Sequence, residues 1–235
     1  MSSASDGFTA KAVTSPRMVP LPTRSSLTDD VYEAIKASIM DNVIPPGGRL
    51  SIDQLARDLG VSATPMREAL VRLESEGLVQ KEPLRGYTTT PLLTVSEVND
   101  LFEFRSVIEP WSAARAAERL DGDGLASLQA EMASVTSLPD GEGYAAYRDL
   151  ANQDERFHRL IAELSGNGEA VLAFTRTHCH LRLFRLGYTP DEGNATLAEH
   201  RAIAAAISAR DADRARSAMA NHLEQARRRL GQHQT

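Results

Sequence analysis

The sequence predicts a mainly α-helical protein in two parts: three helices with a pair of short strands, followed by an all-α antiparallel bundle of about six helices. Three observations predict this fold class. Apolar residues recur three or four positions apart along most of the chain, which is the period of helices with one buried face. Strand-like composition is confined to one stretch, residues 78–90. Alanine is abundant and aromatic residues are scarce beyond Ala113, so closely packed helices are expected there.

Length and composition bound the class of protein. At 235 residues the chain has room for two modest domains, and its 42% hydrophobic and 25% charged content is typical of a globular protein. No apolar run approaches the roughly 20 residues of a membrane span, so no membrane association is expected. The only cysteine, Cys179, has no partner for an intrachain disulfide, which fits a reducing cytoplasm. We therefore expect a cytoplasmic protein.

The chain begins with a polar stretch and an amphipathic helix. Residues 1–24 are rich in Ser, Thr and Pro and lack a helical period, so we interpret them as a flexible tail. Residues 28–42 place Val31 and Ile35 four positions apart, which predicts a helix with one apolar face. Residues 45–48, two prolines and two glycines, end this helix.

A helix, a tight turn and a second helix come next. Ser51 caps a short helix over residues 52–59, and Gly60 supplies the left-handed backbone that ends it. Ser62 is a suitable N-cap for the following helix, which ends at Gly77.

Two strand-like segments, residues 78–81 and 86–90, form a two-stranded hairpin after these helices. Together the elements make a winged helix-turn-helix over residues 25–91, in which the second helix of the pair has the geometry that enters the DNA major groove. Arg67 projects off the buried face of that helix, near its start.

Charge limits what one such domain can do. The whole chain has a formal net charge of −6, and eight basic residues face ten acidic ones between Arg24 and Thr90. Because phosphate neutralisation supplies much of the affinity for DNA, a single copy should bind weakly. A dimer doubles the contacts, so a second copy is expected to be required.

The remainder of the chain, residues 95–231, reads as helical throughout. Residues 91–94 form the hinge that precedes it. Turn residues divide this region into six predicted helices: 96–119, 122–135, 144–164, 169–188, 195–209 and 211–230.

One carboxylate and three histidines have the spacing of a shared site. Asp154 and His158 are four apart on one helix, so they share a face. His200 and His222 each stand 11 residues from Asp211, the turn between the last two helices. In an antiparallel hairpin they lie at the same height, and 11 residues is about three turns. The set suits Zn²⁺ best, with Ni²⁺, Mn²⁺ or Fe²⁺ as alternatives; a surface hydrogen bond and isolated core histidines are the plain alternatives.

Several cations inside the helical region are candidates for holding an anion, among them Arg105, Arg176, Arg182 and Arg185. Arg105 is either a fork that grips a carboxylate or half of an intrahelical pair with Glu109. His178 and His180 point in different directions if they share a helix, so at most one faces a pocket. The run of arginines at 227–229 is interpreted as a solvated helix end. The candidate effector-binding set is Arg105, Asn167, His180 and Arg182.

Both halves together resemble GntR-family transcription regulators of the FadR subfamily, with the metal-binding, FCD type of effector domain. The similarity extends over about residues 25 to 231, and it rests on short segments in the family's order. They are residues 46–50, 60–70, 73–79, 104–109, 154–158, 199–203 and 219–223.

The resemblance implies a homodimer that binds a palindromic operator in double-stranded DNA and represses neighbouring catabolic genes. It also implies a divalent metal with a small organic acid or sugar acid beside it, whose binding alters the DNA-binding domains. The metal ligands by resemblance are Asp154, His158, His200 and His222. The DNA-binding residues by the same resemblance are Arg49, Ser62, Thr64, Pro65, Arg67, Arg72, Arg85 and Gly86.

One departure matters for DNA recognition. Relatives usually place an arginine after the turn serine, where this chain has Ala63. One base-reading candidate is therefore missing, and fewer basic contacts imply a lower affinity or a shallower salt dependence.

Two alternatives belong to other classes. A metal-dependent hydrolase fused to a DNA-binding module would need a general base beside a metal-bound water. Glu155 points away from Asp154, and no other carboxylate is spaced for that role, so we do not expect an enzyme. The second alternative, an acyl-CoA-responsive regulator without metal, would make the spacing of the four candidate ligands a coincidence.

Overall fold

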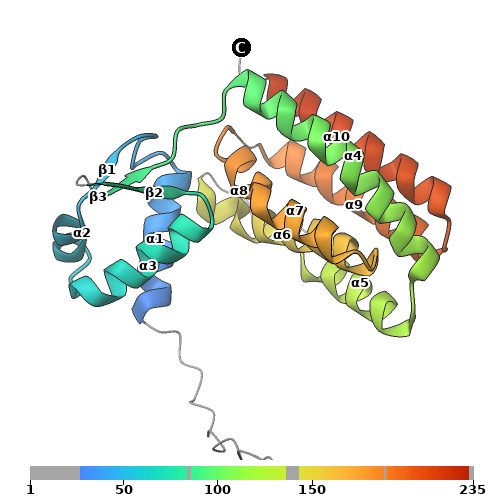
Figure 1. The fold of residues 1–235 in the computed structure, drawn as a ribbon, viewed down its shortest axis with the longest axis horizontal. Helices are drawn as coiled ribbons and strands as arrows, with labels where there is room; N and C mark the ends of the chain where they lie inside the picture. Colours follow the sequence, from blue (N-terminus) through green and yellow to red (C-terminus); the bar gives the residue numbers. More distant parts are fainter. Residues whose placement is uncertain (1–26, 84–85, 136–142, 188, 233–235) are drawn as a thin grey trace, which may run out of the picture.

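A computed structural model describes residues 27–83, 86–135, 143–187 and 189–232 (Figure 1). The expected tail at residues 1–24, the wing residue Arg85 and the turn at residues 138–141, between the predicted helices 122–135 and 144–164, lie outside the described residues.

The first part of the chain, which we call the winged unit, packs helices against a small sheet. Its elements are α1 (Leu27–Met40), β1 (Arg49–Leu50), α2 (Ile52–Asp58), α3 (Ala63–Ser75), β2 (Val79–Glu82) and β3 (Gly86–Thr89). The strand order is β1-β3-β2, all antiparallel, with Leu50 opposite Tyr87 and Glu82 opposite Gly86. The expected two-stranded hairpin is thus corrected to three strands, because the two residues of β1 pair with β3.

Local sequence explains where α2 and α3 begin and end. The Ser51 hydroxyl accepts from the Gln54 amide at 3.4 Å and caps α2. Gly60, at φ +65°, and Gly77, at φ +72°, adopt the left-handed backbone that ends each helix. Ser62 occupies the N-cap of α3, but its hydroxyl makes no cap hydrogen bond. The start of α3 therefore leaves polar groups available at the surface.

The second part, which we call the bundle, is entirely helical in the described residues. Its elements are α4 (Val95–Arg119), α5 (Gly122–Ser134), α6 (Tyr144–Leu164), α7 (Gly168–Thr177), α8 (Cys179–Phe184), α9 (Pro190–Ser208) and α10 (Ala212–Gln232). The predicted helix over 169–188 is wrong, because the chain breaks at His178, whose φ of +46° is left-handed. A capping box between Thr189 and Glu192 starts α9 earlier than the expected residue 195.

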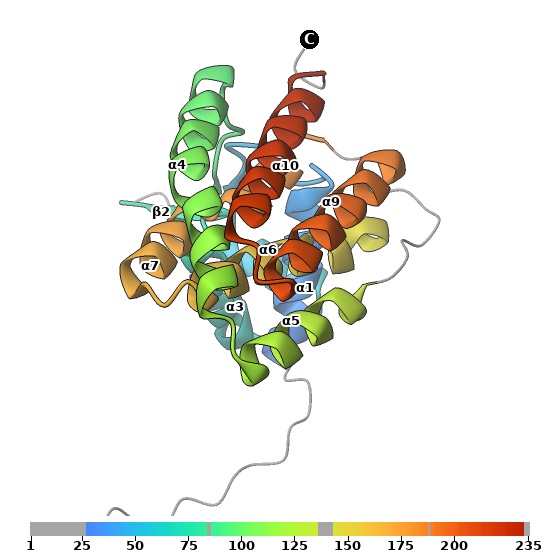
Figure 2. The ribbon, with the colours of Figure 1, turned by 90° about the vertical axis from the view of Figure 1, so that its right-hand side faces the viewer.

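Helices α4, α9 and α10 lie side by side, and α6 packs against α4 and α9 (Figures 1 and 2). The chain reverses between α9 and α10 at Arg210, at φ +57°. Phe102, Phe157, Ile161 and Met219 are buried where these helices meet. No helix in the described part of the chain is long and apolar enough to cross a membrane.

The winged unit and the bundle share side-chain contacts. Asp41, just after α1, accepts a hydrogen bond from the Tyr144 amide at the start of α6. Leu181 of α8 belongs to the same buried apolar cluster as Leu73 and Leu78 of the winged unit. Two of the helices that carry histidines, α6 with His158 and α8 with His180, are therefore in direct contact with the winged unit.

Candidate metal centre and DNA-reading surface

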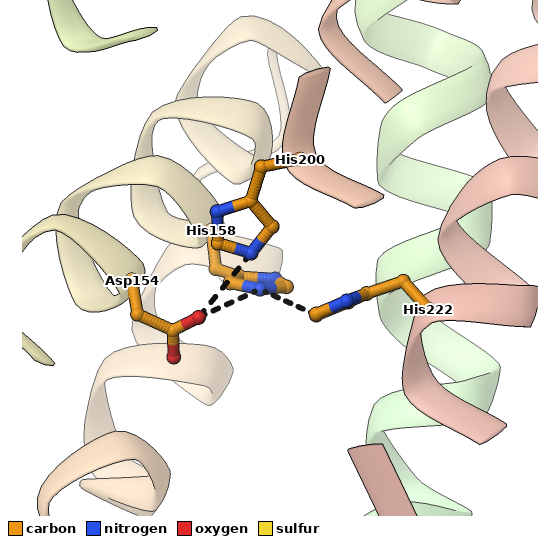
Figure 3. A group of neighbouring side chains, drawn as sticks. All are labelled: Asp154, His158, His200 and His222. Atoms are coloured by element: carbon orange, nitrogen blue, oxygen red, sulfur yellow. Dashed lines mark hydrogen bonds and ion pairs between the residues drawn. The ribbon is translucent and has the colours of Figure 1, made fainter. Parts of the chain in front are cut away.

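Four buried side chains converge between α6, α9 and α10 (Figure 3). Each of Asp154, His158, His200 and His222 offers one ligand atom, and these atoms all lie within 4.8 Å of one another. Nε2 of His200 lies 3.2 Å from the Asp154 carboxylate, and Nε2 of His158 lies 3.2 Å from Nε2 of His222. The α9–α10 hairpin brings its two histidines to one height, as the spacing predicts.

Each of the three imidazoles has a hydrogen-bond acceptor facing its Nδ1 atom. Nδ1–H of His158 donates to Glu109, and Nδ1–H of His222 donates to Glu199 at 2.7 Å. Nδ1 of His200 lies 3.3 Å from the Gln153 side-chain oxygen. Because a carboxylate only accepts, these contacts fix the tautomer that leaves Nε2 unprotonated. All three lone pairs are then aimed at one centre.

That arrangement calls for a cation. Two unprotonated Nε2 atoms 3.2 Å apart, those of His158 and His222, repel each other unless a positive charge lies between them. Nε2 of His200 is buried and makes no hydrogen bond within the described residues. Three imidazole nitrogens and one carboxylate, each imidazole oriented by an outer acceptor, fit a divalent metal of the zinc type.

Burial sets the protonation states that metal binding needs. Burial lowers the pKa of His200 to about 4 and that of His158 to about 3, so both rings are neutral near pH 7. Burial alone would raise the pKa of Glu109, but the Arg105 guanidinium and His158 hold it well below its ordinary range. The imidazoles around Asp154 likewise outweigh burial and hold its pKa well below the usual value. The centre therefore presents neutral rings and an ionised carboxylate.

A cavity of about 80 Å³ opens beside the four side chains. Arg105 and His180, both predicted effector residues, line it together with Asp154 and His222. Arg105 is also paired with Glu109 of the same helix. The guanidinium that lines the cavity is therefore also half of the intrahelical ion pair. The apolar part of the lining consists of Phe102, Leu183, Phe184, Ala226 and Leu230.

Two predicted effector residues lie elsewhere. Asn167 caps α7, where its side-chain oxygen accepts from two amides at 3.0 and 3.3 Å, in a surface recess with Arg119. Arg182 lies toward Glu97, at the start of α4. Hydrogen bonds from Thr94 are the main cause that lowers the pKa of Glu97, and the charge of Arg182 lowers it further. Neither lines the cavity as the described residues form it, so the geometry does not support these two as effector ligands.

Three residues at the site were missed by the sequence reasoning, and the first is Gln153, which faces Nδ1 of His200. Glu199 orients His222, and Arg229 donates to both oxygens of Glu199 at 2.7 and 2.9 Å while lining the cavity. The signal was present, because Arg229 follows His222 by seven residues and so shares its helix face. The interpretation of residues 227–229 as a solvated helix end is therefore wrong for Arg229.

Comparison with known proteins identifies the family. Residues 27–88 match bacterial regulatory proteins of the gntR family, and residues 100–225, more than half of the chain, match the FCD domain. The chain belongs to the GntR family and carries an FCD domain.

Individual relatives agree with the GntR assignment. A transcriptional regulator of the helix-turn-helix type from an unstable DNA locus of Streptomyces ambofaciens is 32% identical over 206 residues, covering 83% of this chain and 80% of the relative. A regulatory protein of Escherichia coli whose name assigns it to the L-lactate dehydrogenase operon is 31% identical over 237 residues, covering 88% of this chain and 86% of the relative. These relatives are regulators of transcription and not enzymes.

A solved structure shares the GntR fold. Escherichia coli McbR/YncC matches with a TM-score of 0.62 at 24% identity, covering 88% of this chain and 98% of that chain. This likeness supports the architecture alone.

In this GntR chain, α3 corresponds to the predicted recognition helix. Ser62, Thr64 and Arg67 are exposed along its first turns, and nothing in the described residues covers that side. Pro65 is buried, so its ring faces the domain core and is not available to DNA. On the wing, Arg49 of β1 and Gly86 of β3 are both exposed.

Arg72 has a structural role in addition to its predicted one. Its guanidinium lies 3.1 Å from Asp29 and 3.7 Å from the ring centre of Tyr32. The side chain remains half exposed, so a phosphate contact would compete with the Asp29 pair. The prediction that Arg72 touches DNA remains, with this competitor added.

Proposed function

We propose that the protein is a homodimeric repressor of catabolic genes whose operator affinity is set by a Zn²⁺-dependent cavity that binds a small carboxylate. The single observation that supports this best is the set of three imidazoles and one carboxylate aimed at one buried centre beside a cavity. DNA binding and effector binding are the roles of the GntR and FCD parts to which the chain belongs. A regulator of this kind acts on chromosomal DNA in the cytoplasm.

The DNA contacts we propose are made by Ser62, Thr64 and Arg67 of α3, with Arg49 and Gly86 on the wing. Each of these residues is exposed on the winged unit. Few of them are cationic, so one unit should bind DNA weakly. A dimer on a palindromic operator doubles the contacts and supplies the missing affinity.

Charge favours a monoanion in the cavity. Asp154 and Glu109 offset two of the three positive charges that a divalent metal and Arg105 bring to this buried region. Glu199 and Arg229 neutralise each other nearby. Two further charged groups line the cavity: Glu192, and His180, where burial lowers the pKa but Cys179 and Asp154 outweigh burial and raise the pKa to about 10. These two charges cancel, so one positive charge is left, which one carboxylate of a ligand would balance.

Size favours a short acid. One water molecule needs about 10–15 Å³ of cavity volume on this measure, so a cavity of about 80 Å³ accepts a small organic acid. One relative's name refers to the L-lactate dehydrogenase operon, which makes L-lactate the first acid to test.

The test combines metal loading with a DNA readout. A duplex selected by the full-length protein from a random library serves as the operator, and its binding is followed by fluorescence anisotropy with and without Zn²⁺. L-lactate, acetate, malonate, gluconate and acetyl-CoA are then added separately. A shift in operator affinity with a short monocarboxylate that needs Zn²⁺ supports the proposal. A response to acetyl-CoA in the presence of a chelator would replace it with the acyl-CoA alternative.

A further inference from the structure

The short helix α8 lies between the cavity and the winged unit. His180 and Leu183 line the cavity, while Leu181, between them, packs in the apolar core of the winged unit. Nδ1–H of His180 donates to the Asp154 carboxylate, whose other oxygen faces His200. One turn of helix thus touches both a predicted metal ligand and the DNA-reading part of the molecule.

Contacts from α8 and its flanks converge on the corner where α3 ends and β2 begins. His178, just before α8, lies against Gly77, because a Cβ placed on Gly77 would be 3.4 Å from the His178 ring. Arg185, just after α8, donates from Nη1 to the Thr90 hydroxyl at 2.9 Å. That hydroxyl lies 2.9 Å from the Gly77 carbonyl oxygen and 3.2 Å from that of Leu78. The end of the recognition helix is therefore held from both ends of α8.

Arg185 is buried with few hydrogen-bond partners. Its residue surface is only 4% exposed, and its Nε and Nη2 make no hydrogen bond in the described part of the chain. No carboxylate of the described residues pairs with it, and burial together with nearby Arg182 lowers its pKa. A buried guanidinium with a single hydroxyl partner is costly to maintain.

The break before α8 allows it to move separately from α7. His178 adopts φ +46° and ψ +33°, a conformation that residues other than glycine seldom adopt. Strained backbone of this kind persists where the surrounding structure enforces it and often marks a point of conformational change.

We propose that α8 couples occupancy of the metal-centred cavity to the end of the recognition helix, and that Arg185 is the positioning residue of this coupling. The inference rests on the proposed function. When a metal binds the Asp154 carboxylate, the hydrogen bond from His180 to that carboxylate fixes the position of His180. His180 in turn fixes the position of α8. The Arg185–Thr90 contact and His178 then carry that displacement to Gly77 and so to the orientation of α3.

The experiment measures hydrogen–deuterium exchange of the metal-free full-length chain with and without Zn²⁺. In the wild type, Zn²⁺ slows exchange in α6 and α8 and alters it in residues 76–90. In Arg185→Gln and in Thr90→Val, each of which removes the Arg185–Thr90 hydrogen bond, slowing in α6 persists and the change at 76–90 is lost. Thr90→Val keeps the shape of the side chain, so it carries the test if Arg185→Gln does not fold. Thr90→Ser keeps the hydroxyl and should behave as wild type.

Operator affinity provides the second readout, using the selected duplex. An allosteric coupling typically changes affinity by about fivefold or more, so the wild-type ratio of Kd values with and without Zn²⁺ should reach that size. The ratio should fall toward one in both variants, and the double variant should lose no more than either single variant. Arg228→Gln, an exposed arginine paired with Glu224, is the matched control and should keep the wild-type ratio.

The outcomes separate the two proposals. Zn²⁺ binding with no change at residues 76–90 in the wild type, or an unchanged response in Thr90→Val, would overturn the coupling through α8 and leave the metal site intact. Absence of Zn²⁺ binding in the wild type would overturn the proposed function itself, and the coupling with it.

Discussion

Replacing Glu199 by Gln tests whether the negative charge of an outer acceptor strengthens a metal ligand. Nδ1–H of His222 lies 2.7 Å from Glu199, which Arg229 holds through both of its carboxylate oxygens. Glutamine keeps the shape and can still accept from His222, but it removes the negative charge that strengthens the imidazole as a ligand. Loss of an outer partner of this kind typically lowers metal affinity by about 10- to 100-fold, equivalent to about 1.4 to 2.7 kcal/mol. The side chains of Glu199 and Arg229 are 17% and 20% exposed, so solvent screening favours the lower end, about tenfold.

The assay is a competition for Zn²⁺ between the protein and a chromophoric chelator at pH 7. Glu224→Gln is the matched control, because it removes one negative charge from the same hairpin at an exposed pair with Arg228. The control should bind Zn²⁺ as the wild type does. Equal affinity of Glu199→Gln and wild type, with both variants folded, would refute the reasoning that Glu199 supports His222 as a ligand.

Three further predictions address DNA binding, pH and the contact between the two parts. Arg67→Ala should weaken binding to the selected duplex and reduce the slope of log K against log salt by about one; an unchanged slope would remove Arg67 from the interface. Burial lowers the pKa of His200 to about 4, so between its ordinary value of about 6.5 and pH 4 the unfolded chain binds a proton that the folded chain does not. As the pH is lowered through this range, the urea midpoint of the metal-free wild type should therefore fall more steeply than that of His200→Asn. Equal slopes would count against a buried neutral His200. Asp41→Ala removes the acceptor for the Tyr144 amide and should cost about 1 kcal/mol in the free energy of unfolding, whereas Asp58→Ala, on exposed α2, serves as its control.

Much of the fold and the centre of the site were predictable because they depend on local periodicity. Asp154 and His158 share a helix face through their spacing of four, and the equal distances of His200 and His222 from Asp211 place them together in any antiparallel hairpin. Turn residues also located α5 and α6 closely. These inferences use geometry within one helix or one hairpin, which the sequence contains directly.

What could not be predicted depends on contacts between distant segments. The break at His178 has neither glycine nor proline to announce it, and its neighbour Gly77 lies a hundred residues away in the chain. The two-residue strand β1 exists only because β3 offers it a partner. Glu199 and Arg229 became recognisable as parts of the site once α9 and α10 were seen to face each other.

Elemental analysis of the purified protein tests the central claim most directly. Wild-type protein prepared without chelators should contain about one divalent metal ion per chain, and the His200→Ala, His222→Ala double variant should contain almost none while keeping its helical circular dichroism. A double variant that retains the full metal content, or a wild type that takes up none when zinc is supplied, would contradict the account.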